Sequence, residues 1–184
     1  MKAYIILSPG FEETEAITVI DILRRARIDA TTVALNENTA VMGSHGIVVI
    51  ADATLTEIRD DQGDALVLPG GMKGVENMLA NESLLALVQK FHDDGKVIAA
   101  VCAAPLIPDK LGILGTKSFT CHPCVYDRLQ SKGVQDVPTI TDGQMVTGRS
   151  AGCAMIWSLA LVKKLLGDYP DGLLNGLRLD KNPL

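Results

Sequence analysis

The stretch that decides the fold is Val97-Ile-Ala-Ala-Val-Cys-Ala-Ala-Pro105. Its first five residues form a short apolar run, which is typical of a parallel strand buried on both faces. A nucleophile elbow needs a sharp strand-to-helix turn with small residues two positions away on either side, and Ala100 and Ala104 fill those positions where glycine is usual. The stretch therefore predicts an elbow that presents the Cys102 thiol at the carboxyl end of a central strand.

Strands and helices alternate on both sides of this stretch. Acidic residues open the first expected helix, which carries Ile17, Ile20 and Leu23 at helical spacing. Asn81 is expected to cap a second helix, and Ser150 a long helix near the C-terminus. The expected strands are Ala3–Leu7, Thr31–Leu35, Gly46–Ile50, Ala65–Leu68 and Val97–Val101, followed by a hairpin from Ile140 to Val146. This rhythm predicts one α/β domain over residues 1–184, with a mostly parallel sheet between two layers of helices.

The composition limits the function classes. The chain has 184 residues, of which 47% are hydrophobic and 21% charged, so it can bury a sizeable core and is not expected to be disordered. A net charge of -5 argues against nucleic-acid binding, because attraction to phosphates supplies most of that affinity. No apolar run approaches the roughly 20 residues of a membrane span. The start does not read as a signal peptide, and four cysteines make no disulfide framework, so a cytoplasmic location is expected.

Cys102 can be interpreted in two ways. A thiol at a helix N-terminus is expected to have a lowered pKa and to act as a nucleophile. The backbone N–H of Ala103 would then point into the site, and with the N–H of Gly71, which follows a buried strand, it could form an oxyanion hole. The alternatives are a buried structural cysteine and an ordinary glycine turn. Spacing alone does not decide between them.

Three carboxylates, Glu12, Glu13 and Glu15, stand at the start of the first expected helix. One interpretation makes them surface groups that suit the helix dipole, and it is expected to hold for at least one of them. The other is that one of them turns toward Cys102 as a general acid or base with a raised pKa. Spacing does not choose which.

The segment Cys121-His122-Pro123-Cys124 has C-x-x-C spacing. A thioredoxin-like dithiol lacks the rest of that pattern, and a zinc site is not expected because no second C-x-x-C or histidine pair exists. In the third interpretation the cysteines are incidental and His122 is the functional residue.

Five motifs together resemble the ThiJ/PfpI superfamily, in the branch of bacterial YajL and the human parkinsonism-associated protein. The match extends from Tyr4 through Gly167, and the motifs are specific in combination although each alone is weak. The resemblance implies a flavodoxin-like three-layer sandwich that forms a homodimer and needs neither a cofactor nor a metal. The motifs are Pro9-Gly-Phe-Glu-Glu-Thr-Glu15, Val67-Leu-Pro-Gly-Gly71, Ala99-Ala-Val-Cys-Ala-Ala-Pro105, His122-Pro123 and Thr147-Gly-Arg-Ser-Ala-Gly152.

The resemblance also implies roles for single residues. Cys102 would be the reactive, oxidation-sensitive cysteine. Glu15 would be the carboxyl that contacts its sulfur, protonated in the resting state. His122 falls on the family's nearby histidine, and Gly71 and Ala103 fall on its backbone donors.

Two basic positions fall where the family uses arginines as an anion site beside the dimer interface. They are Arg25 and the turn Gly43-Ser44-His45. Because His45 stands where relatives often have arginine, an anion would be held more weakly there at neutral pH. The cysteines outside the family pattern are Cys121, Cys124 and Cys153. Cys121 could lie near Cys102 and serve as its resolving thiol.

The resemblance implies two kinds of function. The first is a cofactor-independent glyoxalase or deglycase, in which Cys102 acts on a small aldehyde or a glycated protein. The second is an oxidative-stress sensor or redox-regulated chaperone, in which Cys102 oxidises to a sulfinic acid. A peptidase of the PfpI branch is not expected, because there a histidine follows the elbow cysteine and here Ala103 does.

Overall fold

The computed structural model describes residues 1–179, so residues 180–184 of the predicted domain lie outside the described part. Its centre is a seven-stranded sheet in the order β5-β2-β1-β6-β7-β9-β8, in which only the β8–β9 pair is antiparallel. The predicted mostly parallel sheet and its final hairpin are confirmed. The strands are β1 (Lys2–Leu7), β2 (Asp29–Ala34), β5 (Ala53–Thr54), β6 (Ala65–Leu68), β7 (Val97–Val101), β8 (Thr139–Asp142) and β9 (Met145–Gly148).

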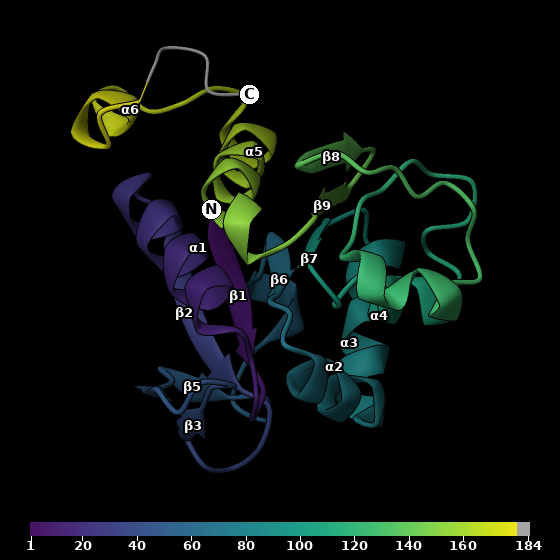
Figure 1. Ribbon diagram of the computed structural model, residues 1–184. Helices are drawn as coiled ribbons and strands as arrows, with labels where there is room; N and C mark the ends of the chain where they lie inside the picture. Colours follow the sequence, from purple (N-terminus) through teal and green to yellow (C-terminus); the bar gives the residue numbers. More distant parts are fainter. Residues whose placement is uncertain (180–184) are drawn as a thin grey trace.

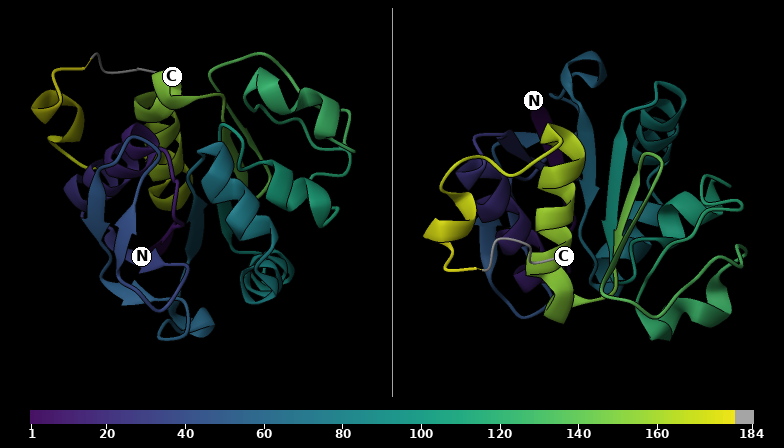
Figure 2. Two further views of the ribbon diagram at one scale, coloured as in Figure 1. Left: turned by 60° about the horizontal axis from the view of Figure 1, so that its bottom comes forward. Right: turned by 90° about the horizontal axis from the view of Figure 1, so that it is seen from above.

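Helices cover both faces of this sheet, which gives the expected three layers (Figures 1 and 2). One face carries α1 (Glu13–Arg25) and α5 (Ala154–Leu166), and the other carries α2 (Met72–Leu79), α3 (Glu82–Asp93) and α4 (Leu106–Lys110). A short α6 (Leu173–Gly176) follows α5, and 3-10 helices cover Asp60–Gln62, Pro123–Arg128 and Ala151–Cys153. None of the helices in the described part has the length and apolar character to cross a bilayer.

The central strand β7 divides its side chains between two hydrophobic cores. Val97, Ala99 and Val101 pack with residues of α1 and α5, whereas Ile98 and Ala100 pack with residues of α2 and α3. All five residues are buried, as are all four of β6. Because side chains alternate along a strand, a central strand between two helical layers has to be apolar throughout.

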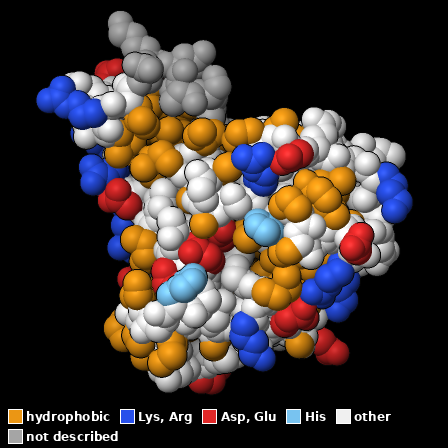
Figure 3. Space-filling view, in the orientation of Figure 1, with side chains coloured by type: hydrophobic (Ala, Val, Ile, Leu, Met, Phe, Trp, Pro, Cys, Tyr) orange, Lys and Arg blue, Asp and Glu red, His pale blue; other side chains and the backbone are white. Residues whose placement is uncertain are grey.

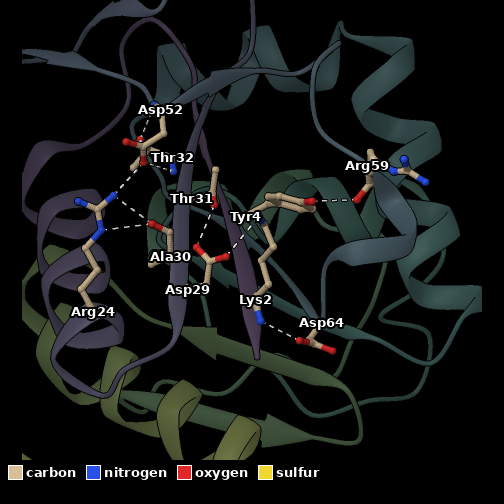
Figure 4. A network of polar contacts seen from close by, with 10 residues as sticks. All are labelled: Lys2, Tyr4, Arg24, Asp29, Ala30, Thr31, Thr32, Asp52, Arg59 and Asp64. Atoms are coloured by element: carbon tan, nitrogen blue, oxygen red, sulfur yellow. Dashed lines mark hydrogen bonds and ion pairs between the residues drawn. The ribbon is translucent and has the colours of Figure 1, made fainter.

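Polar contacts fix the C-terminal end of α1 against the edge of the sheet (Figure 4). The Arg24 guanidinium donates to the carbonyl of Ala30 at 3.0 Å and to the carboxylate of Asp52 at 2.8 Å. Asp52 also accepts from the backbone N–H and the hydroxyl of Thr32, at 2.9 and 2.7 Å. These bonds join α1, β2 and the segment before β5, and so position α1 along the sheet.

The predicted strand at Gly46–Ile50 is confirmed as β4 (Val48–Ile50), which pairs with β3 (Ala40–Met42) in a separate hairpin whose outer side chains are exposed. The predicted cap of the last long helix is wrong. Ser150 does not cap α5, because a 3-10 turn intervenes and the Ser150 side chain makes no capping bond. Asn81, by contrast, caps α3 as predicted, accepting from the N–H of Leu84 at 2.9 Å.

Candidate active site

Cys102 stands on a sharp turn at the carboxyl end of β7, as the elbow prediction requires. Its φ is 61°, a left-handed conformation that is unfavourable for a residue with a side chain. Backbone hydrogen bonds hold it there: the Cys102 N–H donates to the carbonyl of Gly148, and its carbonyl accepts from the N–H of His122, both at 2.9 Å. The strain is thus maintained by two neighbouring segments of the chain, a situation that is common at functional sites.

Glu15 reaches this turn from α1. Its side chain is fully buried, and Oε2 accepts from the N–H of Gly70 at 2.7 Å. Only glycine fits at position 70, because an added Cβ would lie 2.7 Å from the Cβ of Cys102 and 2.7 Å from Oε2 of Glu15. The carboxyl and the thiol therefore lie side by side, and the hydrogen bond between the two side chains raises the pKa of Cys102 and opposes the rise in the pKa of Glu15.

Glu15 is the carboxyl that turns inward toward Cys102, and its role as a general acid or base stays a prediction. Burial raises the pKa of Glu15 to about 7, the charge of Glu12 adds to this, and the bond from Gly70 opposes it. At neutral pH the carboxyl therefore exists in both protonation states. Its second oxygen, Oε1, is buried without a hydrogen-bond partner among the described residues.

The prediction of a lowered pKa at Cys102 is wrong. Burial raises the pKa of the thiol, and so does the charge of Glu15, while the N–H groups of Ala103 and Gly71 oppose the rise by donating to the sulfur. The expected helix dipole is missing because α4 begins only at Leu106, beyond a turn. When Glu15 holds a proton its repulsion disappears, so the two groups behave as a coupled pair.

The other two carboxylates at the start of α1 make hydrogen bonds that stabilise the fold. Glu12 caps the helix, accepting from the N–H of Glu15 at 2.8 Å. Glu13 is buried and accepts hydrogen bonds from Ser44 and His45. Burial alone would raise the pKa of Glu13, but the bonds from His45 and Ser44 outweigh it and lower the pKa to about 2. The expectation that at least one of the three is a surface carboxylate suited to the helix dipole is met by the half-buried Glu12.

His122 lies beside the elbow through its backbone. Its N–H donates to the carbonyl of Cys102, and its ring Nδ1 accepts from the N–H of Cys124 at 3.2 Å. This bond leaves Nε2 of the half-buried ring for a ligand. In the view of Figure 3, acidic side chains lie between two histidine side chains near the middle of this face.

Within one chain, the structure does not bring the two residues of the predicted anion site together. His45 faces Glu13 in the first turn of α1, whereas Arg25 pairs with Asp21 in the last turn, at 2.7 Å. The 13 residues of α1 place these turns about 18 Å apart. The role of an anion site at this interface stays a prediction.

Cys121 does not face the elbow. It is buried in the core on the α2–α3 side, whereas Cys102 packs against the core on the α1–α5 side. The resolving-thiol hypothesis thus finds no support in this placement. Burial raises the pKa of Cys121 to about 12, which also makes it a poor attacking thiol. All four cysteines are free.

Sequence reasoning missed Gly70 and the turn at Gly43-Ser44-His45 as parts of the site's support. Two adjacent glycines after a buried strand were a usable signal, because two residues without Cβ atoms permit close approach on both sides. No local pattern links the turn to the first turn of α1, since the two segments are about thirty residues apart.

Comparisons with known proteins agree with this geometry. The model of the DJ-1/PfpI family matches residues 1–164. Protein dj-1beta of Drosophila melanogaster is 36% identical over 169 residues, which cover 90% of each chain. A protein of Thermococcus kodakarensis named as a deglycase is 31% identical over 167 residues, covering 90% of this chain and 99% of its own. The crystal structure of Drosophila melanogaster DJ-1beta superposes with a TM-score of 0.91 at 33% identity, covering 97% of this chain and 98% of that chain. With a family model that matches residues 1–164 and a relative that is 36% identical over most of its length, the chain belongs to the DJ-1/PfpI family.

Proposed function

We propose that this protein is a cofactor-independent glyoxalase and deglycase, which acts on methylglyoxal-type aldehydes and their early adducts through Cys102. The observation that carries the proposal is the pairing of a strained elbow cysteine with a buried carboxyl whose pKa is about 7. The name of the Thermococcus kodakarensis relative supports the deglycase part.

The first step is attack of the Cys102 sulfur on the aldehyde carbon. Glu15 in its carboxylate form takes the thiol proton as the carbon–sulfur bond forms and passes it to the former carbonyl oxygen, which gives a hemithioacetal and restores the carboxylate. The N–H groups of Gly71 and Ala103, which point to the sulfur, can stabilise the oxygen that gains negative charge. The elbow thus supplies the nucleophile, its base and its donors within one turn of chain.

The second step moves a proton between the two oxidised carbons. The hemithioacetal carbon loses its proton to a base, the resulting enediol is reprotonated at the neighbouring carbon, and a thioester of lactate on Cys102 results. Water then cleaves the thioester, releasing lactate and restoring the thiol, so that methylglyoxal plus water gives lactate overall. We assign the role of this base to Glu15. In His122, ring Nδ1 already accepts the N–H of Cys124, and the residue is bonded to Cys102 through its backbone N–H.

The test is lactate formation from methylglyoxal without glutathione. We expect turnover in the wild type and none in Cys102→Ala. Cys124→Ser is the matched control, because that thiol is exposed and the variant keeps its backbone N–H. Since Glu15 acts as a base, turnover should rise with pH through about 7. Turnover that persists in Cys102→Ala, or is absent from the wild type, contradicts the proposal.

A deglycase has to be distinguished from a scavenger of free aldehyde. An adduct of methylglyoxal with N-acetyl-lysine or N-acetyl-cysteine releases aldehyde slowly by itself. The adduct is therefore incubated with excess aminoguanidine, which traps the free aldehyde. If the enzyme still accelerates the appearance of free amine or thiol in the trap, it acts on the adduct. If the trap abolishes the acceleration, the protein is a glyoxalase only.

The alternative function is a redox sensor or redox-regulated chaperone. The donors around the sulfur favour it, because the N–H groups of Gly71 and Ala103 and a protonated Glu15 would suit the oxygens of a sulfinate. Mild peroxide should then add two oxygen atoms to Cys102, seen by intact mass, in a protein that turns over no aldehyde. Oxidation confined to the exposed Cys124 would contradict this alternative.

Association and location also remain proposals. The β3–β4 hairpin exposes Met42, Val48 and Ile50 to the extent of 58, 50 and 66%, which suits burial against a second copy of the chain in a homodimer. Four free thiols suit a reducing compartment, in line with a cytoplasmic location.

A further inference from the structure

Glu13 is a buried carboxylate that the proposed reaction does not use. It lies in the first turn of α1, two residues before Glu15, and only 5% of its surface is exposed. Its Oε2 accepts from the Ser44 hydroxyl at 3.0 Å and lies 2.8 Å from Nδ1 of His45, while Oε1 accepts from the His45 N–H at 2.6 Å. A carboxylate taken out of water is costly unless donors surround it in this way, so Glu13 holds the turn strongly.

The same turn is bonded to the chain just before α1. The Ser44 N–H donates to the carbonyl of Phe11, and the Gly10 N–H donates to the carbonyl of Met42, both at 2.8 Å. Together with the Glu13 side chain, these bonds fix the segment Gly10–Glu13 from the side of the β3–β4 hairpin.

On its other side this segment contacts the loop that serves Cys102. The Glu12 N–H donates to the carbonyl of Gly70 at 3.0 Å, and the Gly74 N–H donates to the carbonyl of Gly10 at 3.2 Å. A Cβ on Gly71 would collide with the carbonyl oxygen of Gly10. The segment is therefore packed between the hairpin turn and the loop whose N–H groups point at Glu15 and at the sulfur.

We propose that Glu13 is a positioning residue: by anchoring the Gly10–Glu13 segment on the Gly43–His45 turn, it sets the placement of the Glu15 carboxyl against Cys102. The inference rests on the proposed function only in taking Cys102 as the reacting group. Misplacement by a fraction of an ångström is enough to matter at such a site.

The effect of Glu13 would pass through position rather than through charge. The charge that adds to the raised pKa of Glu15 is that of Glu12. The titratable groups close to Glu13 are Glu12 and the exposed His45. Because Glu13→Gln also removes a negative charge, which by itself would lower the pKa of Glu15, a movement of the segment has to be read from a variant that keeps the Glu13 carboxylate.

The test follows the alkylation of Cys102 by iodoacetamide across a range of pH, read by peptide mass spectrometry on the full-length protein. The wild-type profile should show a step at the pKa of Glu15, about 7. Glu13→Gln keeps the side-chain length but leaves one carbonyl oxygen for three donors. We expect the step to move down by about one pH unit, because partial hydration of Glu15 relieves its burial.

Two further variants make the test decisive. Gly43→Ala keeps the Glu13 carboxylate but should displace its side chain, because the new Cβ would lie 2.7 Å from Cγ of Glu13. This variant should therefore move the step in the same direction. Glu57→Gln is the matched control, since Glu57 also accepts from a backbone N–H and a hydroxyl, both of Thr54, and it should leave the step in place.

An unmoved step in both folded variants, with only the thermal midpoint lowered, would overturn the proposal and make Glu13 a stability residue. A step that moves in Glu13→Gln but not in folded Gly43→Ala would also overturn it, because the effect would then be one of charge. If Glu13→Gln does not fold, Gly43→Ala decides alone. The readout needs no substrate, so failure of the proposed enzymatic function would leave this test intact.

Discussion

Replacing Glu15 by glutamine should stabilise the folded protein, and the stabilisation should grow with pH. Glu15 is fully buried, and burial raises its pKa from the ordinary value of 4.5 to about 7. The folded state therefore holds this proton more tightly than the unfolded chain does. The stabilising contribution of the proton is complete below about pH 4.5 and is lost as the pH rises through about 7, where the buried carboxyl has to ionise.

The magnitude follows from the difference between the two pKa values. At about 1.4 kcal/mol per pH unit, ionising Glu15 in the folded protein costs about 3.5 kcal/mol at alkaline pH. Glutamine carries no charge and keeps an acceptor for the Gly70 N–H, so it avoids this cost. Between about pH 5 and about pH 8.5 the advantage of Glu15→Gln should increase by about 2.5 kcal/mol, or by about 5–10 °C in thermal midpoint for a chain of this size.

Urea unfolding of the wild type and Glu15→Gln at both pH values measures this difference directly. Asp21→Asn is the control, because it removes an exposed carboxylate of the same helix, and its effect should be alike at both pH values. If Glu15→Gln changes the free energy of unfolding equally at both pH values, Glu15 does not hold a proton in the folded state. The assignment of Glu15 as the titrating partner of Cys102 would then be refuted. The same variant should lose turnover, because glutamine accepts no proton.

Three other substitutions test the fold and the surface. Gly71→Ala should lower turnover at least tenfold, measured by steady-state kinetics, and should also lower the thermal midpoint of unfolding. The reason is that φ at position 71 is 85° and the new Cβ collides with the carbonyl of Gly10. Trp157→Phe should cost about 1–3 kcal/mol in denaturant unfolding, since it leaves the buried carbonyl of Val146 without the indole N–H that donates to it at 3.1 Å. Ile50→Lys should shift a dimer toward monomer in light scattering, because a charge cannot be buried there unpaired; an unchanged mass would exclude this hairpin from the interface.

Much of the fold could be predicted from local patterns. The two central strands are continuous apolar runs, and a strand covered by helices on both sides has to be so. The Gly46–Ile50 run is predicted correctly as a strand, but its pairing with β3 is not predicted, because strand propensity specifies extended backbone and not the partner strand. The start of α5 was misplaced because a serine ahead of an apolar helix signals a cap but does not exclude an intervening 3-10 turn.

The sequence by itself determined the turn that carries Cys102, because a strand, a cysteine and small neighbours are consecutive in the chain. The sequence limited the candidates for the carboxyl beside Cys102 to three glutamates, but their spacing did not show which of them it is. Tertiary structure made that choice, since the orientation of α1 against the sheet directs Glu15 to Gly70 and Cys102, and Glu13 to the turn at His45. It also reversed the sign of the thiol pKa shift, because burial and an adjacent carboxyl depend on segments far apart in sequence, which no local pattern encodes.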